Sequence, residues 1–213
     1  MNVKIEPYQY MKIIDLVDQL IHSYQSVNDI KTIEAVQSIT VEKIYQTLPE
    51  ISKEELEDLI TVILDRQLTR ESVEKYFETF KAFVIPFSEP SEKQIEKVFR
   101  KVKKLKFPDF KNLDLREYTY IGWNDSGTQK KFLLYYQEEK LAGMYGELST
   151  KIVKGFCSIC HHESNVAMFT ATTKKASEGR YTKKGNYICV DSERCNRHLQ
   201  AREDLDAFLE KTK

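Results

Sequence analysis

The four cysteines of this chain all lie in its last third and are spaced like the ligands of a metal ion. Two residues separate Cys157 from Cys160, 28 residues follow before Cys189, and five residues separate Cys189 from Cys195. Clustered pairs of this kind favour a metal over disulfides in a reducing compartment. Four thiolates complete the tetrahedral coordination that zinc prefers in structural sites. The sequence therefore predicts one structural Zn²⁺ held by Cys157, Cys160, Cys189 and Cys195.

The same ligand set argues against catalysis. A catalytic zinc keeps one position open for water, and four cysteines leave none. His161 and His162 adjoin the first cysteine pair, where surface or supporting roles are expected of them, and no nucleophile adjoins His198 or His22. With seven glycines and no glycine-rich phosphate loop, a nucleotide-binding fold is not indicated. We expect no enzyme, no catalytic residues and no small-molecule substrate.

Aromatic and basic residues are interleaved around the cysteines. The set comprises Phe156, Arg180, Tyr181, Lys183, Lys184 and Tyr187. This composition is typical of an interface hot spot for protein or RNA. In the alternative interpretation, Phe156 and Tyr187 pack over the zinc shell while the lysines keep a loop soluble. We take Phe156, Lys184 and Tyr187 as the predicted partner-binding residues.

Residues 1–83 are expected to form an antiparallel four-helix bundle. Apolar residues recur at intervals of three and four over 10–24, and less regularly over 30–48. Ser52 and Glu55 form a capping-box pair for a third helix, and Thr69 is the expected N-cap of a fourth. Pro86 and Pro90 then mark a linker.

Residues 84–213 are expected to form a second domain of α/β type. Ser91 and Gln94 form a capping-box pair that opens a basic helix running to Leu105. Three runs rich in aromatic and β-branched residues follow, at 118–123, 132–136 and 141–145, and predict an antiparallel meander packed under that helix. A short closing helix is expected around 205–209. The predicted fold class is α+β, a helical bundle followed by an antiparallel sheet with a four-cysteine zinc-binding fold.

The charge is distributed unevenly although the formal net charge is zero. Residues 1–90 carry 9 Lys and Arg against 16 Asp and Glu, whereas residues 91–213 carry 24 against 17. The basic half suits an acidic partner such as RNA or an acidic protein surface, although ordinary solvated charge explains the counts equally well. No run of about 20 apolar residues and no signal peptide is present, so a cytoplasmic protein without membrane contact is expected.

Several sequence blocks resemble the FusB-type fusidic acid resistance proteins, the elongation factor G binding proteins of Gram-positive bacteria. The blocks are FRKVKKLKFPD (99–109), YIGWND (120–125), YGELS (145–149), VKGFCSICHHESN (153–165) and YTKKGNYICVDSERCN (181–196). The cysteine blocks are specific, and together with the length and the helical first half they extend the resemblance over essentially the whole chain.

The resemblance implies a two-domain protein whose second domain is a treble-clef-like zinc finger with four cysteine ligands. It further implies binding to elongation factor G, alone and on the ribosome, and release of the factor from ribosomes stalled by fusidic acid. A secondary ribosome contact stays open. The competing interpretation is a zinc-containing RNA-binding module acting on the ribosome, and a thiol-based redox sensor is a third class, disfavoured because its CxxC lacks a strand-and-helix setting.

Overall fold

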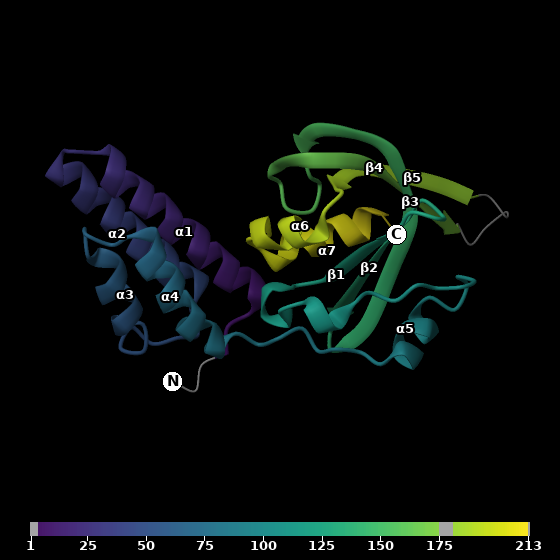
Figure 1. Ribbon diagram of the computed structural model, residues 1–213, viewed down its shortest axis with the longest axis horizontal. Helices are drawn as coiled ribbons and strands as arrows, with labels where there is room; N and C mark the ends of the chain where they lie inside the picture. Colours follow the sequence, from purple (N-terminus) through teal and green to yellow (C-terminus); the bar gives the residue numbers. More distant parts are fainter. Residues whose placement is uncertain (1–3, 175–180, 213) are drawn as a thin grey trace. The chain divides into compact units, whose positions relative to one another are not determined.

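The computed structural model describes residues 4–174 and 181–212, and it divides into two compact units, Met1–Ile85 and Pro86–Lys213 (Figure 1). Each unit has its own apolar core. Among the described residues, no helix has both the length and the apolar character needed to cross a bilayer.

The first unit consists of helices packed around one apolar core. In chain order these are α1 (Pro7–Ser26), α2 (Ile30–Thr47), α3 (Glu57–Leu64), α4 (Arg70–Phe80) and the 3-10 turn η1 (Lys81–Phe83). Two tyrosines tie distant helices together: Tyr10 donates a hydrogen bond to the Phe77 carbonyl at 3.2 Å, and Tyr24 donates one to the Ile63 carbonyl at 2.7 Å. The predicted helical first half is therefore confirmed.

The third helix begins later than predicted. Ser52 Oγ does accept a hydrogen bond from the Glu55 backbone N–H at 3.3 Å, but the chain then forms short turns and α3 starts only at Glu57. Leu56, which is fully buried, lies in these turns. The predicted capping pair therefore belongs to the turns before the helix, and Leu56 is the N-cap residue of α3.

The second unit contains a five-stranded antiparallel sheet whose strands follow chain order (Figure 1). The strands are β1 (Ile121–Asp125), β2 (Lys130–Gln137), β3 (Lys140–Phe156), β4 (Glu163–Lys174) and β5 (Tyr181–Cys189). The helical segments are α5 (Glu92–Val98), the 3-10 turns η2 (Phe110–Asn112) and η3 (Leu115–Glu117), and then α6 (Ser192–His198) and α7 (Arg202–Thr212). The predicted α+β class, the three-strand meander and the closing helix are confirmed.

Strand β3 connects the two halves of the sheet. Its first part pairs with β2 and its last part pairs with β4, with an irregularity between Leu148 and Ile152. A bulge of this kind bends and twists a strand, and Figure 1 shows the long β3 curving past the other strands. This bend carries the end of β3, and the cysteine segment that follows it, to α6 and α7.

The predicted basic helix is shorter than expected. Its capping box is present, since Ser91 and Gln94 exchange side-chain and backbone hydrogen bonds, but α5 ends at Val98. The C-cap Phe99 is buried against Trp123 and Phe132, at ring-centroid distances of 5.6 and 5.3 Å. The remaining lysines of the run therefore lie on an irregular segment, not on one helical face.

Candidate metal centre

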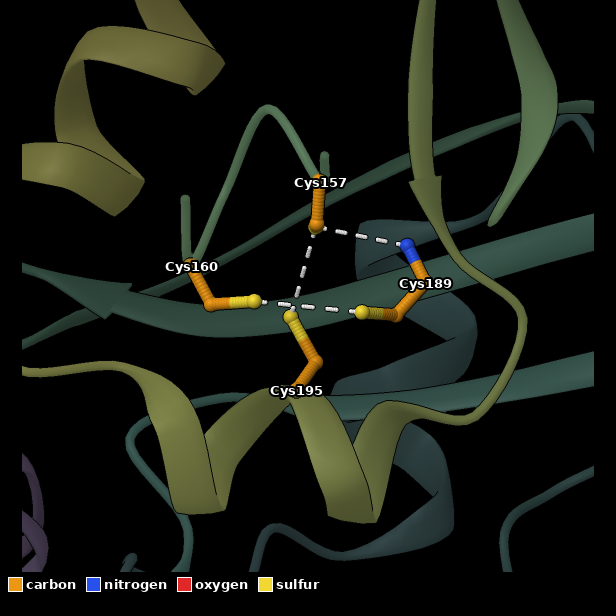
Figure 2. A group of neighbouring side chains, drawn as sticks. All are labelled: Cys157, Cys160, Cys189 and Cys195. Atoms are coloured by element: carbon orange, nitrogen blue, oxygen red, sulfur yellow. Dashed lines mark hydrogen bonds between the residues drawn. The ribbon is translucent and has the colours of Figure 1, made fainter. Parts of the chain in front are cut away.

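Four elements bring the cysteines together (Figure 2). Cys157 follows the end of β3, Cys160 lies in the turn before β4, Cys189 ends β5, and Cys195 lies in α6. All four side chains are buried. The sequence analysis predicted the four ligands, but it did not predict the strands β4 and β5 or the helix α6. For α6 a signal was present, because Asp191 is a favourable N-cap residue and its carboxylate accepts the backbone N–H groups of the first helical turn.

The sulfur geometry fits a tetrahedral zinc ion. The Sγ atoms of Cys157 and Cys195 lie 3.8 Å apart, as do those of Cys160 and Cys189, and all four lie within 4.8 Å of one another. Four ligands at the usual Zn–S distance of about 2.3 Å would have sulfur–sulfur edges of about 3.8 Å. No S–S bond joins any pair. The donor set is soft and complete, and it leaves no coordination position for water.

Backbone N–H groups support the thiolate form of Cys157. Ile159 and Cys189 each donate a backbone hydrogen bond to Cys157 Sγ at 3.3 Å. The first cysteine turn is closed by a hydrogen bond from the His161 N–H to the Cys157 carbonyl at 2.9 Å. His161 itself has φ 56°, a left-handed conformation that lets the chain reverse between the strands. The turn is therefore held by backbone hydrogen bonds, and the Cys157 sulfur points toward the other three cysteines.

Without a cation, ionisation of one of these buried thiols opposes ionisation of its neighbours. Hydrogen bonding with the Cys160 side chain, and then with Cys189 and Cys195, holds the pKa of Cys157 well below its usual range. The same contacts act in the opposite sense on two of the other thiols: interaction with Cys157 is the largest cause that raises the pKa of both Cys160 and Cys195. A bound divalent cation removes this conflict, because it stabilises every ligand as a thiolate.

The histidines near the cluster serve other contacts. The His162 ring stacks on His198 at a centroid distance of 4.8 Å, and His162 Nδ1 lies 2.8 Å from the Cys160 carbonyl oxygen. His161 Nε2 lies 3.5 Å from Asp204 Oδ1. Among the described residues, the group able to hold a metal contains the four cysteines alone.

The predicted partner-binding residues lie around this centre but not on one face. Phe156 is 73% exposed and Tyr187 43% exposed, while Lys184 is partly buried. Paired residues in an antiparallel sheet point to the same side. The partners of Phe156, Tyr187 and Lys184 on β4 are residues 163, 168 and 171. Alternation along β4 therefore assigns Phe156 and Lys184 to one face and Tyr187 to the other.

One exposed residue near Phe156 was not predicted from the sequence. Ile152 is 54% exposed and pairs with Ala167, so it shares a face with Phe156. The exposed Lys154 lies between them. The spacing of Ile152, Lys154 and Phe156 at every second position was a usable sequence signal, because residues two apart in a strand lie on the same face. Arg180, which the sequence also suggested, lies outside the described residues, as do the side chains of Tyr181 and Lys183.

Comparison with known proteins agrees with this architecture. Residues 4–88 match the family described as elongation factor G-binding protein, N-terminal, and residues 95–212 match the FBP C-terminal treble-clef zinc-finger. A solved structure of the fusidic acid resistance protein FusC is similar, with a TM-score of 0.90 and 40% sequence identity, covering 100% of this chain and 99% of that one. No curated protein sequence matches the chain. Together with the sulfur geometry, the treble-clef match confirms the predicted structural zinc.

Proposed function

This chain belongs to the family of elongation factor G-binding proteins, and on that premise we propose that it binds elongation factor G and confers resistance to fusidic acid. In the finer form of the proposal, it promotes release of the factor from ribosomes on which the drug has stalled it. The observation that carries the proposal is an exposed aromatic side chain, Phe156, beside a rigid metal-held turn.

We propose that the docking surface is centred on Phe156, on one face of the β3–β4 hairpin near the zinc turn, and that Tyr187 of β5 contributes from the other face at the same end of the sheet. The backbone N–H of Ser158, in the zinc turn, donates to the Tyr187 carbonyl at 2.8 Å, so the turn and β5 are held together. A surface that is ordered before binding loses little conformational entropy on association. Exposed aromatics on such a surface are typical hot-spot residues.

The proposed mechanism requires no chemistry on the drug. A ligand shifts an equilibrium only by binding one state better than another. We propose that the chain binds elongation factor G more tightly in a conformation with weaker ribosome contacts, so binding energy favours dissociation of the stalled factor. Relief of inhibition should then saturate with protein concentration. Drug recovered after incubation should keep its mass, and hydrolysed or conjugated drug formed in excess over protein would contradict the proposal.

The competing proposal is an RNA-binding module, and the exposed Lys101, Lys103 and Lys104 after α5 favour it. The two proposals differ in their salt dependence. Contacts with phosphates make log affinity fall steeply and linearly with log salt, whereas a mixed aromatic protein interface falls less. Titrations against purified elongation factor G and against ribosomal RNA over a range of salt concentrations distinguish them.

The decisive experiment follows labelled elongation factor G as it dissociates from ribosomes stalled with fusidic acid. The wild-type chain should accelerate dissociation, and Phe156→Ala should lose most of that effect while keeping its zinc. Ile39→Ala is a matched control, because Ile39 is a 52% exposed apolar residue of α2, in the other unit. If the chain binds the factor by size-exclusion co-elution but leaves dissociation unchanged, the binding proposal stands and the release proposal fails.

A further inference from the structure

Lys131, on strand β2 between β1 and β3, is a completely buried lysine. It is 0% exposed and pairs with Asn124 on β1 and Gly146 on β3. Lys131 Nζ donates hydrogen bonds to the Asn124 side-chain oxygen at 3.1 Å and to the Val190 carbonyl oxygen at 3.0 Å. Neither acceptor carries a formal charge. Burial of an ammonium without a compensating negative charge is strongly unfavourable.

Among the residues that the structure describes, no carboxylate forms an ion pair with Lys131. Asp191 is the nearby acid, but its carboxylate accepts the backbone N–H groups at the start of α6. Asp191 therefore contributes only part of the negative charge around this ammonium, after Cys195 and Cys189.

The metal centre supplies such a charge. One Zn²⁺ and four thiolates together carry a net charge of about −2 in a buried site. Val190, whose carbonyl holds Lys131 Nζ, directly follows the ligand Cys189 and lies in the segment that leads to Cys195. We propose that Lys131 is the counter-charge of the zinc tetrathiolate, a charged supporting residue that helps the site retain its metal and keeps its sulfurs unreactive.

The electrostatic environment of Lys131 supports this assignment. Burial lowers the pKa of Lys131 to about 8, and the opposing influences that raise it come from Cys195, Cys189, Asp191 and Cys157. Three of these four groups are zinc ligands. The ammonium and the thiolates thus stabilise each other, and the coupling is reciprocal: whatever the thiolates contribute to the charged lysine, the lysine contributes to them.

A second role must be separated from the first. Asn124 Nδ2 also donates to the Val190 carbonyl, at 3.1 Å, so Lys131 and Asn124 together hold the segment between the second pair of ligands. A loss of zinc in a Lys131 variant could then come from a lost hydrogen bond. Asn124→Ala is the matched control, because it removes one of the two hydrogen bonds to Val190, and one acceptor of Lys131 Nζ, while it leaves the charge in place.

The test measures zinc transfer from the full-length zinc protein to a chromophoric chelator, and alkylation of its thiols by iodoacetamide followed by intact mass. Lys131→Met should accelerate both by about tenfold or more, which is the usual cost of losing a supporting residue around a metal site. Lys131→Arg, which keeps the charge, should stay closer to wild type, and Asn124→Ala should change little. Equal effects of Lys131→Met and Asn124→Ala would overturn the proposal in favour of a purely structural role.

A charge-swap cycle makes the test independent of whether Lys131→Met folds alone. Cys160→His replaces a thiolate by a neutral ligand and reduces the negative charge of the site by about one unit. If Lys131 is the counter-charge, Lys131→Met should cost less zinc retention in the Cys160→His background than in the wild-type background. Additive effects would overturn the proposal. The proposal would also be overturned if Cys160→His alone gave folded, zinc-bound protein and the double variant did not.

Discussion

The helical unit buries a continuous apolar core that runs from Ile5 to Val84, whereas the last part of the C-terminal unit closes around four buried thiols. Apolar burial is distributed over many side chains, so each contributes a few kcal/mol. A metal site concentrates its contribution in one ion and four ligands. The two units should therefore lose their structure under different perturbations. The predictions below test that difference, from the largest expected effect to the smallest.

Removal of zinc should unfold the cysteine-bearing part of the second unit and spare the helices. Structural zinc contributes on the order of 10 kcal/mol to the folding of the segment that holds it. Chelation, or Cys189→Ser, should abolish amide protection in β4, β5 and α6 while protection in α1 and α2 persists. Hydrogen exchange with mass spectrometry measures this directly. Equal loss of protection in both units would show that they fold as one cooperative body.

Truncation of the helical core should have the complementary effect. Leu20 is fully buried in α1, and Leu20→Ala should destabilise the first unit by about 2–5 kcal/mol because it leaves a cavity. Zinc content should remain at one ion per chain. Urea unfolding followed by far-UV circular dichroism, with zinc measured in parallel, checks both results. Loss of zinc in this variant would contradict the separation of the two units.

Truncation at the proposed docking surface should affect binding without affecting stability. Phe156→Ala and Tyr187→Ala should each weaken binding to elongation factor G by about 2 kcal/mol or more if they are hot spots. Thermal unfolding and zinc content should stay unchanged, because both side chains are substantially exposed. Calorimetric titration provides the affinities. Because the two side chains belong to opposite faces, an effect of one substitution alone would show which face is used.

Helix caps provide the smallest and most closely matched comparison. Asp29 caps α2 in the first unit, and Ser91 caps α5 in the second, each by accepting a backbone N–H of the first turn. Asp29→Ala and Ser91→Ala should each cost about 1 kcal/mol. Each loss should appear only in the unfolding transition of its own unit. A shift of both transitions by either variant would reveal energetic coupling between the units.

The elements that were predicted well depend on local chemistry. The stripe through α1, the caps at Thr69 and Ser91 and the closing helix with Leu205 and Phe208 can each be read within a few residues. The elements predicted poorly depend on distant contacts. The helix α5 ends early where Phe99 packs edge-on against the stacked rings of Trp123 in β1 and Phe132 in β2, whereas β4 is placed by pairing with β3 and β5 by pairing with β4.

By itself, the sequence determined the zinc ligands, because four thiolates at these spacings are a complete and specific ligand set for one metal. It also determined the helical first half and the α+β class through periodicity and capping. Only the tertiary structure decided which side chains share a surface. Strand register places Phe156 and Tyr187 on opposite faces of the sheet. Long-range packing buries Lys131, whose Nζ donates a hydrogen bond to the carbonyl of Val190, the residue after the zinc ligand Cys189. Register and burial are set by non-local pairing, which residue types along the chain do not specify.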